Sequence, residues 1–140
     1  MSVKITSAQS RHFKWLATHD QHVAEAWVRR CISLGEYFVA ELEAMPVGFL
    51  RFSWFWGTIP YMELIYVLPD HRHSGIGRAL FERWEIAMRR DGARLLMTSS
   101  ARDEAAPQGW HSNNGFREAG TVTFGCLQQT PEAFFTKDLR

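Results

Sequence analysis

Residues 67–77 read Val-Leu-Pro-Asp-His-Arg-His-Ser-Gly-Ile-Gly, and this stretch decides how the chain is interpreted. The apolar run 62–68 has the length and the β-branched or aromatic content of a strand, which Pro69 ends. From Ile76 onward, apolar residues recur at helical spacing. A glycine-containing turn between a strand and a helix lets backbone N–H groups converge at the helix N-terminus, where they can bind phosphate.

Glycine alone is a weak indication, because many strand–helix turns carry glycine only where φ must be positive. Basic residues favour the phosphate interpretation, since Arg72 and Arg78 crowd a helix N-terminus, which disfavours cations unless an anion is bound. The turn lacks the G-K-[ST] ending of nucleotide triphosphatases and the first glycine of a dinucleotide fingerprint, so nothing argues for ATP or NAD. A phosphate site and a purely structural turn both stay open at this point.

The pattern V-x-P-x-x-R-x-x-G-x-G over residues 67–77 resembles the acetyl-CoA signature of the GNAT superfamily of N-acyltransferases. The core of that signature is written [QR]-x-x-G-x-[GA], and it binds the pyrophosphate of coenzyme A. The resemblance implies acetyl-CoA as co-substrate, with the pantetheine amides pairing with the backbone of one strand like an additional strand. The implied cofactor-binding residues are Ile65, Tyr66 and Val67 on the strand, Arg72, His73, Ser74, Gly75, Ile76, Gly77 and Arg78 around the turn, and Asn113 further along the chain.

Length and composition favour one globular domain spanning residues 1–140. The formal net charge of +1 gives no reason to expect nucleic acid or an anionic membrane as partner. Cys31 and Cys126 form neither a metal-binding nor a dense disulfide pattern, so no metal site is supported. Since no run approaches the roughly 20 apolar residues of a spanning helix, we expect a cytoplasmic protein.

The hydrophobic pattern predicts the element order β-α-α-β-β-β-α-β-α-β-β. Hairpins require antiparallel neighbours, whereas strand–helix–strand units require parallel ones. We therefore predict an α/β (mixed α+β) fold with a central twisted mixed sheet of about six or seven strands and helices on both faces, the order that GNAT domains have. The expected strands are 3–6, 36–42, 47–56, 61–68, 94–100, 116–127 and 134–139, and the expected helices lie within 10–34, 75–92 and 104–114.

Glu63 is the candidate general base. Acetyl transfer to an amine requires that a carboxylate or a water chain takes a proton. Strand alternation places Tyr61, Glu63 and Val67 on one face, so Glu63 is a carboxylate in an otherwise apolar row leading to the turn. An exposed strand end or a structural ion pair is the alternative. Some GNAT enzymes have a glutamate four residues before the motif valine, which is the position of Glu63.

His111 is the candidate acid for the leaving thiolate. GNAT chains often carry F-Y-x-x-x-G-F, whose tyrosine lies near the coenzyme A sulfur, and residues 110–116 here read Trp-His-Ser-Asn-Asn-Gly-Phe. Histidine stands where tyrosine is expected, and it can donate a proton near neutral pH. An ordinary surface histidine is the alternative. Asn114, which precedes a glycine, fits a helix C-cap better than a cofactor contact.

The resemblance implies an N-acetyltransferase in which a primary amine of a small molecule, peptide or protein attacks acetyl-CoA directly. The acceptor itself is not indicated. A catalytically silent module that binds acyl-CoA is one alternative, and another α/β domain with a merely structural glycine turn is a second. An aromatic cluster can line an acceptor pocket by attracting ammonium groups, or else form core or a homodimer surface. Its members are Phe52, Trp54, Phe55, Trp56 and Tyr61.

Overall fold

The structure is a computed structural model that describes residues 2–140. Within these residues the chain forms two compact units. The first comprises the residues up to Ser53 together with Leu64–Ala87, and the second comprises Trp54–Glu63 and Met88–Arg140. The single domain expected over residues 1–140 stays a prediction. No helix within residues 2–140 combines the length and the apolar character that crossing a membrane requires.

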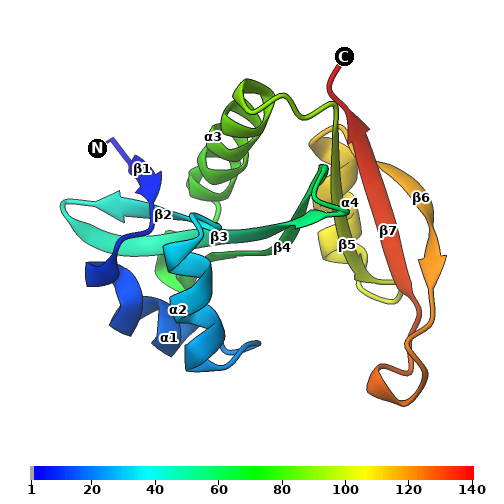
Figure 1. Cartoon of the computed structure of the whole chain (residues 1–140), viewed down its shortest axis with the longest axis horizontal. Coiled ribbons are helices and arrows are strands. Elements are labelled where there is room, and N and C mark those ends of the chain that lie inside the picture. Colours follow the sequence, from blue (N-terminus) through cyan, green and yellow to red (C-terminus); the bar gives the residue numbers. More distant parts are fainter. Residues whose placement is uncertain (1) are drawn as a thin grey trace. The chain divides into compact units, whose positions relative to one another are not determined.

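The order of helices and strands within residues 2–140 confirms the predicted order (Figure 1). The strands are β1 (Lys4–Ser7), β2 (Tyr37–Leu42), β3 (Met45–Phe55), β4 (Ile59–Val67), β5 (Leu95–Ala101), β6 (Arg117–Val122) and β7 (Glu132–Asp138). The helices are α1 (Phe13–His19), α2 (Glu25–Ser33), α3 (Ile76–Arg90) and α4 (Ala105–Asn113).

The described strands form one seven-stranded sheet in the order β1-β2-β3-β4-β5-β7-β6. β4 pairs in parallel with β5, at Tyr61 opposite Met97 and at Met62 opposite Thr98. The pairs β1–β2, β2–β3, β5–β7 and β6–β7 are antiparallel. The mixed α/β fold predicted from the hairpins and the strand–helix–strand unit is therefore confirmed.

One predicted strand is wrong in length. The apolar and polar alternation predicted a strand over 116–127, but β6 ends at Val122. A 3-10 helix over Gly125–Leu127 follows, and Gly125 begins it with a φ of 59°. Because that left-handed backbone cannot continue a strand, the chain turns here before β7 begins.

In the first unit, helices cover both faces of the sheet formed by β2 and β3 (Figure 1). Tyr37, Val39 and Phe49 share one face through the β2–β3 register, and they form a buried cluster with Leu16 of α1 and Val28 of α2. The alternate residues face α3. Because both faces of β2 and β3 are covered by helices, nearly every residue of these two strands is apolar.

The α3 face of the first unit is packed by aromatic rings. The Phe52 ring lies 6.0 Å from the Phe38 ring and 6.0 Å from the ring of Trp84, a fully buried residue of α3. The guanidinium of Arg83 lies 5.3 Å from the centre of the Phe38 ring. This packing places Phe52 in the core, whereas Phe55 and Trp56 of the expected aromatic cluster are exposed at the β3–β4 turn.

A buried ion pair anchors the end of α1 to the sheet. Asp20 follows α1 directly, and its Oδ2 accepts hydrogen bonds from the Tyr37 hydroxyl at 2.6 Å and from Arg51 Nε at 2.7 Å. Burial, and then the bond to Asp20, raise the pKa of the Tyr37 hydroxyl. Asp20, Tyr37 and Arg51 are all buried, so each hydrogen bond compensates polar groups that are withdrawn from water.

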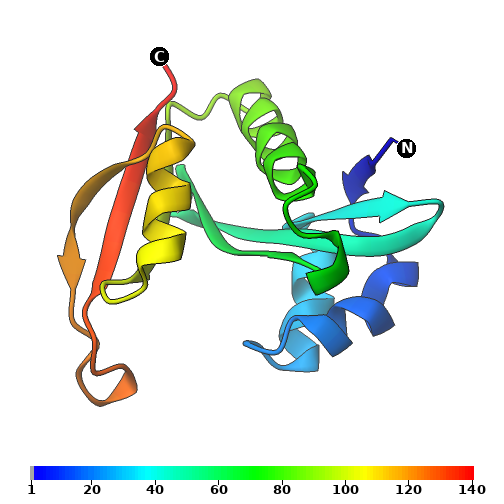
Figure 2. The same cartoon turned by 180° about the vertical axis from the view of Figure 1, so that it is seen from behind.

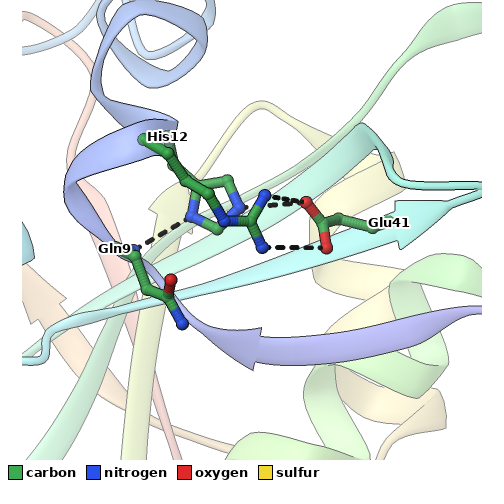
Figure 3. A network of polar contacts seen from close by, with 4 residues as sticks. Gln9, His12 and Glu41 are labelled. Carbon is green, nitrogen blue, oxygen red and sulfur yellow. Dashed lines mark hydrogen bonds and ion pairs between the residues drawn. The ribbon is translucent and has the colours of Figure 1, made fainter.

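A second polar network fixes the start of α1 (Figure 3). The Gln9 backbone N–H donates to His12 Nδ1 at 2.9 Å, so the proton of a neutral His12 ring lies on Nε2, 3.0 Å from Glu41 Oε2. Arg11 also donates to Glu41 at 2.8 Å, and this bond holds the pKa of the carboxyl below its ordinary value. The network joins the residues before α1 to Glu41 of β2, and all of them are distant from the glycine turn in sequence.

In the second unit, α4 packs on β5 and β7 (Figure 2). The β5–β7 register pairs Thr98 with Phe135 and Ser99 with Phe134, so Phe134 and Phe135 point to opposite faces. The His111 ring of α4 lies 5.2 Å from the Phe135 ring. α4 therefore covers the Phe135 face of this unit, and Ser99 and Phe134 lie on the other face.

Candidate functional site

The turn between β4 and α3 has the left-handed backbone that its glycine predicted. After a 3-10 helix over Pro69–His71, Arg72 is extended, His73 has a φ of 62° and Gly75 a φ of 89°. A Cβ built on Gly75 would meet no atom of the described chain within 4 Å. Glycine is therefore required here by the backbone angle, and the outer side of the turn is open.

The turn leads into a helix N-terminus that suits an anion. α3 is 15 residues long, and Ala79 N–H donates to Gly75 O at 3.0 Å as it begins. An α-helix leaves its first N–H groups without an intrahelical acceptor, and its dipole makes this end positive. His73, Ser74 and Gly75 are exposed beside it. These residues fit the pyrophosphate of acetyl-CoA.

Arg72 is held by the strand that precedes the turn. Its Nε donates to the Val67 carbonyl at 2.8 Å, and its guanidinium lies 5.6 Å from the centre of the Tyr66 ring. The Arg72 side chain therefore closes the turn onto β4 as well as adding charge. Ser74 Oγ donates to the His71 carbonyl within the turn. Arg78 is exposed and forms an ion pair with Glu82 at 3.2 Å.

The end of β4 that leads to the turn is packed on both faces. The Tyr66 ring stacks at 6.0 Å on His19 of α1 and lies 5.6 Å from the Phe49 ring. A Cβ on Gly48 of β3 would lie 2.8 Å from the Tyr66 carbonyl oxygen. Gly48 therefore lets β3 approach the backbone of β4 at the residues expected to pair with pantetheine. Ile65, Tyr66 and Val67 are all half-buried.

Glu63 lies half-buried on β4, in the second unit. Strand alternation places it on the same face as Tyr61. Tyr61 in turn bonds to Ser99, so this is the face opposite α4. A carboxylate at this point of the strand has the chemistry of a general base, and its assignment as the base stays a prediction.

His111 lies in the core of the second unit rather than on its surface. Its side chain is 5% exposed and contacts the rings of Phe116 and Phe135, and neither ring nitrogen has a hydrogen-bond partner among the described residues. Burial lowers its pKa to about 4, against smaller raising effects from the Ser99 backbone and the Glu132 carboxylate. The ring is therefore neutral at pH 7, and within the second unit it lies on the opposite face from Glu63. These surroundings disfavour the acid role predicted from the sequence.

The two asparagines beside His111 differ in what the structure shows. Asn114 caps the C-terminus of α4, as predicted, and its Nδ2 donates to the Trp110 carbonyl at 2.8 Å. Asn113 is the exposed last residue of α4. Its contact with the cofactor stays a prediction.

The Glu63 face of the second unit carries a polar group that was not predicted from the sequence. Tyr61, Ser99 and Glu132 are linked there by hydrogen bonds, although the last two are 33 positions apart in sequence. The only signal in the sequence was a tyrosine two positions before Glu63. Among residues 2–140, no cluster of His, Cys, Asp and Glu side chains is arranged to hold a metal ion.

Comparison with known proteins identifies the family to which the chain belongs. The family model of the acetyltransferase (GNAT) domain matches residues 33–118. An aminoglycoside N(6')-acetyltransferase type 1 from Acinetobacter haemolyticus is 28% identical over 109 residues, which cover 74% of this chain and 72% of that protein.

Solved structures share the fold at low sequence identity. Ard1 from Thermoplasma volcanium has a TM-score of 0.87 at 14% identity, covering 100% of this chain and 99% of that one. The protein yncA from Salmonella typhimurium, whose structure was solved with acetyl-CoA, has a TM-score of 0.77 at 21% identity, covering 100% of this chain and 95% of that one. With more than half of its residues matched by the family model, the chain belongs to the GNAT family of acetyltransferases and is an acetyl-CoA-dependent N-acetyltransferase.

Proposed function

We propose that the protein transfers the acetyl group of acetyl-CoA to a primary amine of a small polycationic molecule by direct attack of the amine nitrogen. The observation that carries the proposal is the turn at residues 72–77, where left-handed backbone at His73 and Gly75 precedes the N-terminus of α3. The relative from Acinetobacter haemolyticus, named as an aminoglycoside acetyltransferase, supports an acceptor with several amino groups. A cytoplasmic location and a homodimer stay predictions from the sequence.

The chain would hold the co-substrate at two places. The N–H groups from His73 to Arg78 would bind the pyrophosphate, with Arg78 adding positive charge at the turn. The backbone of Ile65 to Val67 would pair with the pantetheine amides as a neighbouring strand does. When bound, acetyl-CoA supplies an activated thioester carbonyl. Arg72 would hold these two segments in place relative to each other, because its side chain joins the turn to the Val67 carbonyl.

Glu63 would take the proton that leaves the attacking nitrogen, directly or through one water. Its position on β4, four residues before Val67, supports this role, since the strand runs from Glu63 to the turn without interruption. One proton leaves the amine and one reaches the thiolate, so the reaction needs no further reactant. His111 is the sequence-based candidate for the second proton, and its burial makes solvent the better donor.

An amine panel tests the proposal. Acetyl-CoA is mixed with the protein and with kanamycin, spermidine or a peptide with a free N-terminus, and released thiol is measured. We expect release with kanamycin or spermidine. Replacement of Glu63 by glutamine preserves shape and should lower kcat by about 10²-fold or more, because general base catalysis contributes about that much.

Calorimetry with acetyl-CoA is the control for this panel. Glu63→Gln should bind acetyl-CoA as the wild type does, since the substitution leaves the turn unchanged. If the wild type binds acetyl-CoA but no amine releases thiol, the protein is an acyl-CoA-binding module and the proposed transfer is wrong. If acetyl-CoA does not bind, the glycine turn is only structural.

A further inference from the structure

Side chains from three segments of the second unit form a continuous chain of hydrogen bonds. The Tyr61 hydroxyl oxygen on β4 lies 2.6 Å from Ser99 Oγ on β5. Ser99 Oγ donates at 2.6 Å to Oε2 of Glu132, the first residue of β7. Gln128 Nε2 donates to the other carboxylate oxygen at 3.0 Å. All four residues are half-buried, so these bonds are partly shielded from water.

The Glu132 carboxylate sets the direction of the hydrogen bonds from Tyr61 through Ser99. An ionised carboxylate only accepts hydrogen bonds, so the single hydroxyl proton of Ser99 points to Glu132. Ser99 Oγ is then the acceptor of the bond with Tyr61, and the phenolic proton points toward Ser99. The lone pairs of the Tyr61 oxygen point away from its own proton. Because successive hydrogen bonds polarise one another, the charge of Glu132 makes that oxygen a stronger acceptor.

Glu132 carries a negative charge that the protein does not balance locally. Within residues 2–140 its hydrogen bonds come from the neutral groups of Ser99 and Gln128, and no cationic side chain forms an ion pair with it. A half-buried carboxylate with only neutral donors favours a cation nearby. The neighbouring titratable ring, His111, is neutral at pH 7 and lies on the other face of the sheet.

The chain of hydrogen bonds lies on the face that carries the candidate base. Tyr61 precedes Glu63 by two residues on β4, so both side chains leave the strand on one face about 7 Å apart. The Tyr61 ring stacks at 6.1 Å on Phe134 of β7, which fixes the position of the hydroxyl. Tyr61 is thus a rigid acceptor of hydrogen bonds beside a carboxylate.

We propose that Tyr61 binds the protonated amino group of the acceptor. Ser99 and Glu132 position the Tyr61 hydroxyl so that its oxygen accepts a hydrogen bond from an N–H of that ammonium group. The inference rests on the proposed function and names the chemistry that selects the acceptor, which is a primary ammonium group. Tyr61 is the acceptor-binding residue, and Ser99 and Glu132 are positioning residues. Glu63 takes one proton of the bound ammonium group, which leaves the neutral amine that attacks the thioester. The proton that the nitrogen loses after the attack balances the one that the leaving thiolate takes up.

Steady-state kinetics with kanamycin as acceptor test the proposal. Tyr61→Phe keeps the ring that stacks on Phe134 and removes the hydroxyl. It should raise the acceptor KM about 10- to 100-fold, the loss expected for a hydrogen bond to a charged group, and leave the KM of acetyl-CoA unchanged. Ser99→Ala and Glu132→Gln should raise the acceptor KM in the same direction, and Ser99→Thr, which keeps a hydroxyl, should stay near wild type.

Ser100→Ala is the matched control for Ser99→Ala. Ser100 is the next residue of β5 and points to the opposite face, where its Oγ is buried with no hydrogen-bond partner among the described residues. Its replacement should leave both KM values unchanged. Since Ser99 acts through Tyr61, the double variant Tyr61→Phe/Ser99→Ala should be no worse than Tyr61→Phe alone. The positioning role would be overturned if the double variant showed additive increases in the acceptor KM, or if Ser100→Ala raised the acceptor KM as much as Ser99→Ala does.

The outcomes separate this inference from the proposed transfer. Turnover of kanamycin with an unchanged acceptor KM in Tyr61→Phe overturns the inference and leaves the transfer intact. If no thiol is released, kanamycin is titrated by calorimetry into the protein saturated with coenzyme A. Binding that is lost in Tyr61→Phe supports the ammonium site although the transfer fails, and absence of binding to the wild type contradicts the site.

Discussion

Arg72 occupies the position at which the acetyl-CoA signature accepts arginine or glutamine, and its hydrogen bond explains what the two residue types share. Both side chains carry an N–H that can donate to the Val67 carbonyl, which Arg72 Nε reaches at 2.8 Å. Positive charge is not common to both. We therefore attribute the requirement at this position mainly to closing the turn onto β4.

Substitution of Arg72 separates the contribution of its positive charge from that of its hydrogen bond. Arg72→Gln should keep most of the affinity for acetyl-CoA, whereas Arg72→Ala should lower it by about tenfold, the equivalent of one hydrogen bond. Arg78→Gln is a matched loss of charge next to the turn, and its exposed ion pair with Glu82 contributes little. Calorimetry measures all three. Equal losses in Arg72→Gln and Arg72→Ala would show that the charge matters and the hydrogen bond does not.

His111 should make the fold sensitive to mild acid. Its pKa is lowered from 6.5 to about 4, so the unfolded chain binds a proton below about pH 6.5 while the folded protein resists it until about pH 4. The free energy of unfolding therefore falls as the pH decreases through this window, by about 3 kcal/mol in all. Above pH 6.5 the full stability is present.

Urea unfolding at pH 7.5 and pH 5 checks this expectation. His111→Leu removes two buried nitrogens that have no hydrogen-bond partner among residues 2–140. It should lose most of the difference in unfolding free energy between the two pH values. The exposed His22 provides the control His22→Gln, which should behave as the wild type. If His111 protonates the thiolate, His111→Leu lowers kcat sharply. Because solvent is the better donor, we expect kcat to change little.

At the scale of elements, β3, β4 and α3 meet at Gly48. A Cβ there would lie 2.8 Å from the Tyr66 carbonyl oxygen and 3.3 Å from a methyl carbon of Leu80. The first contact is with backbone, which cannot move aside without shifting β4. Tyr66 belongs to the segment of β4 proposed to pair with pantetheine. The packing of Gly48 against the Tyr66 backbone should therefore affect the binding of acetyl-CoA.

Gly48→Ala should therefore impair both stability and binding. We expect the free energy of unfolding to fall by about 1–3 kcal/mol and the affinity for acetyl-CoA to fall with it, measured by urea unfolding and calorimetry. Gly109→Ala is the matched control, because Gly109 belongs to α4, outside the turn, and its new Cβ would meet no described atom within 4 Å. Wild-type affinity in Gly48→Ala would show that the backbone position of Tyr66 does not matter for binding.

At the scale of the whole molecule, local patterns predicted the element order and the turn. The strand before Pro69, the glycine turn and the amphipathic α3 are set by neighbouring residues, so they were visible in the sequence. The burial of His111 was not, because it depends on Phe135, which reaches it through the pairing of β7 with β5. The link between Ser99 and Glu132 depends on the same pairing and was missed for the same reason.

The central claim is that the turn at residues 72–77 binds acetyl-CoA, and its most direct test is calorimetric titration of Gly75→Leu. Gly35→Leu is the matched control. Gly35 has a φ of 71°, close to the 89° of Gly75, and a Cβ built on it would also meet no described atom within 4 Å, but Gly35 follows α2 and lies outside the turn. Both variants carry similar backbone strain. We predict that the wild type and Gly35→Leu bind acetyl-CoA and that folded Gly75→Leu does not. Equal binding by both variants would contradict the claim.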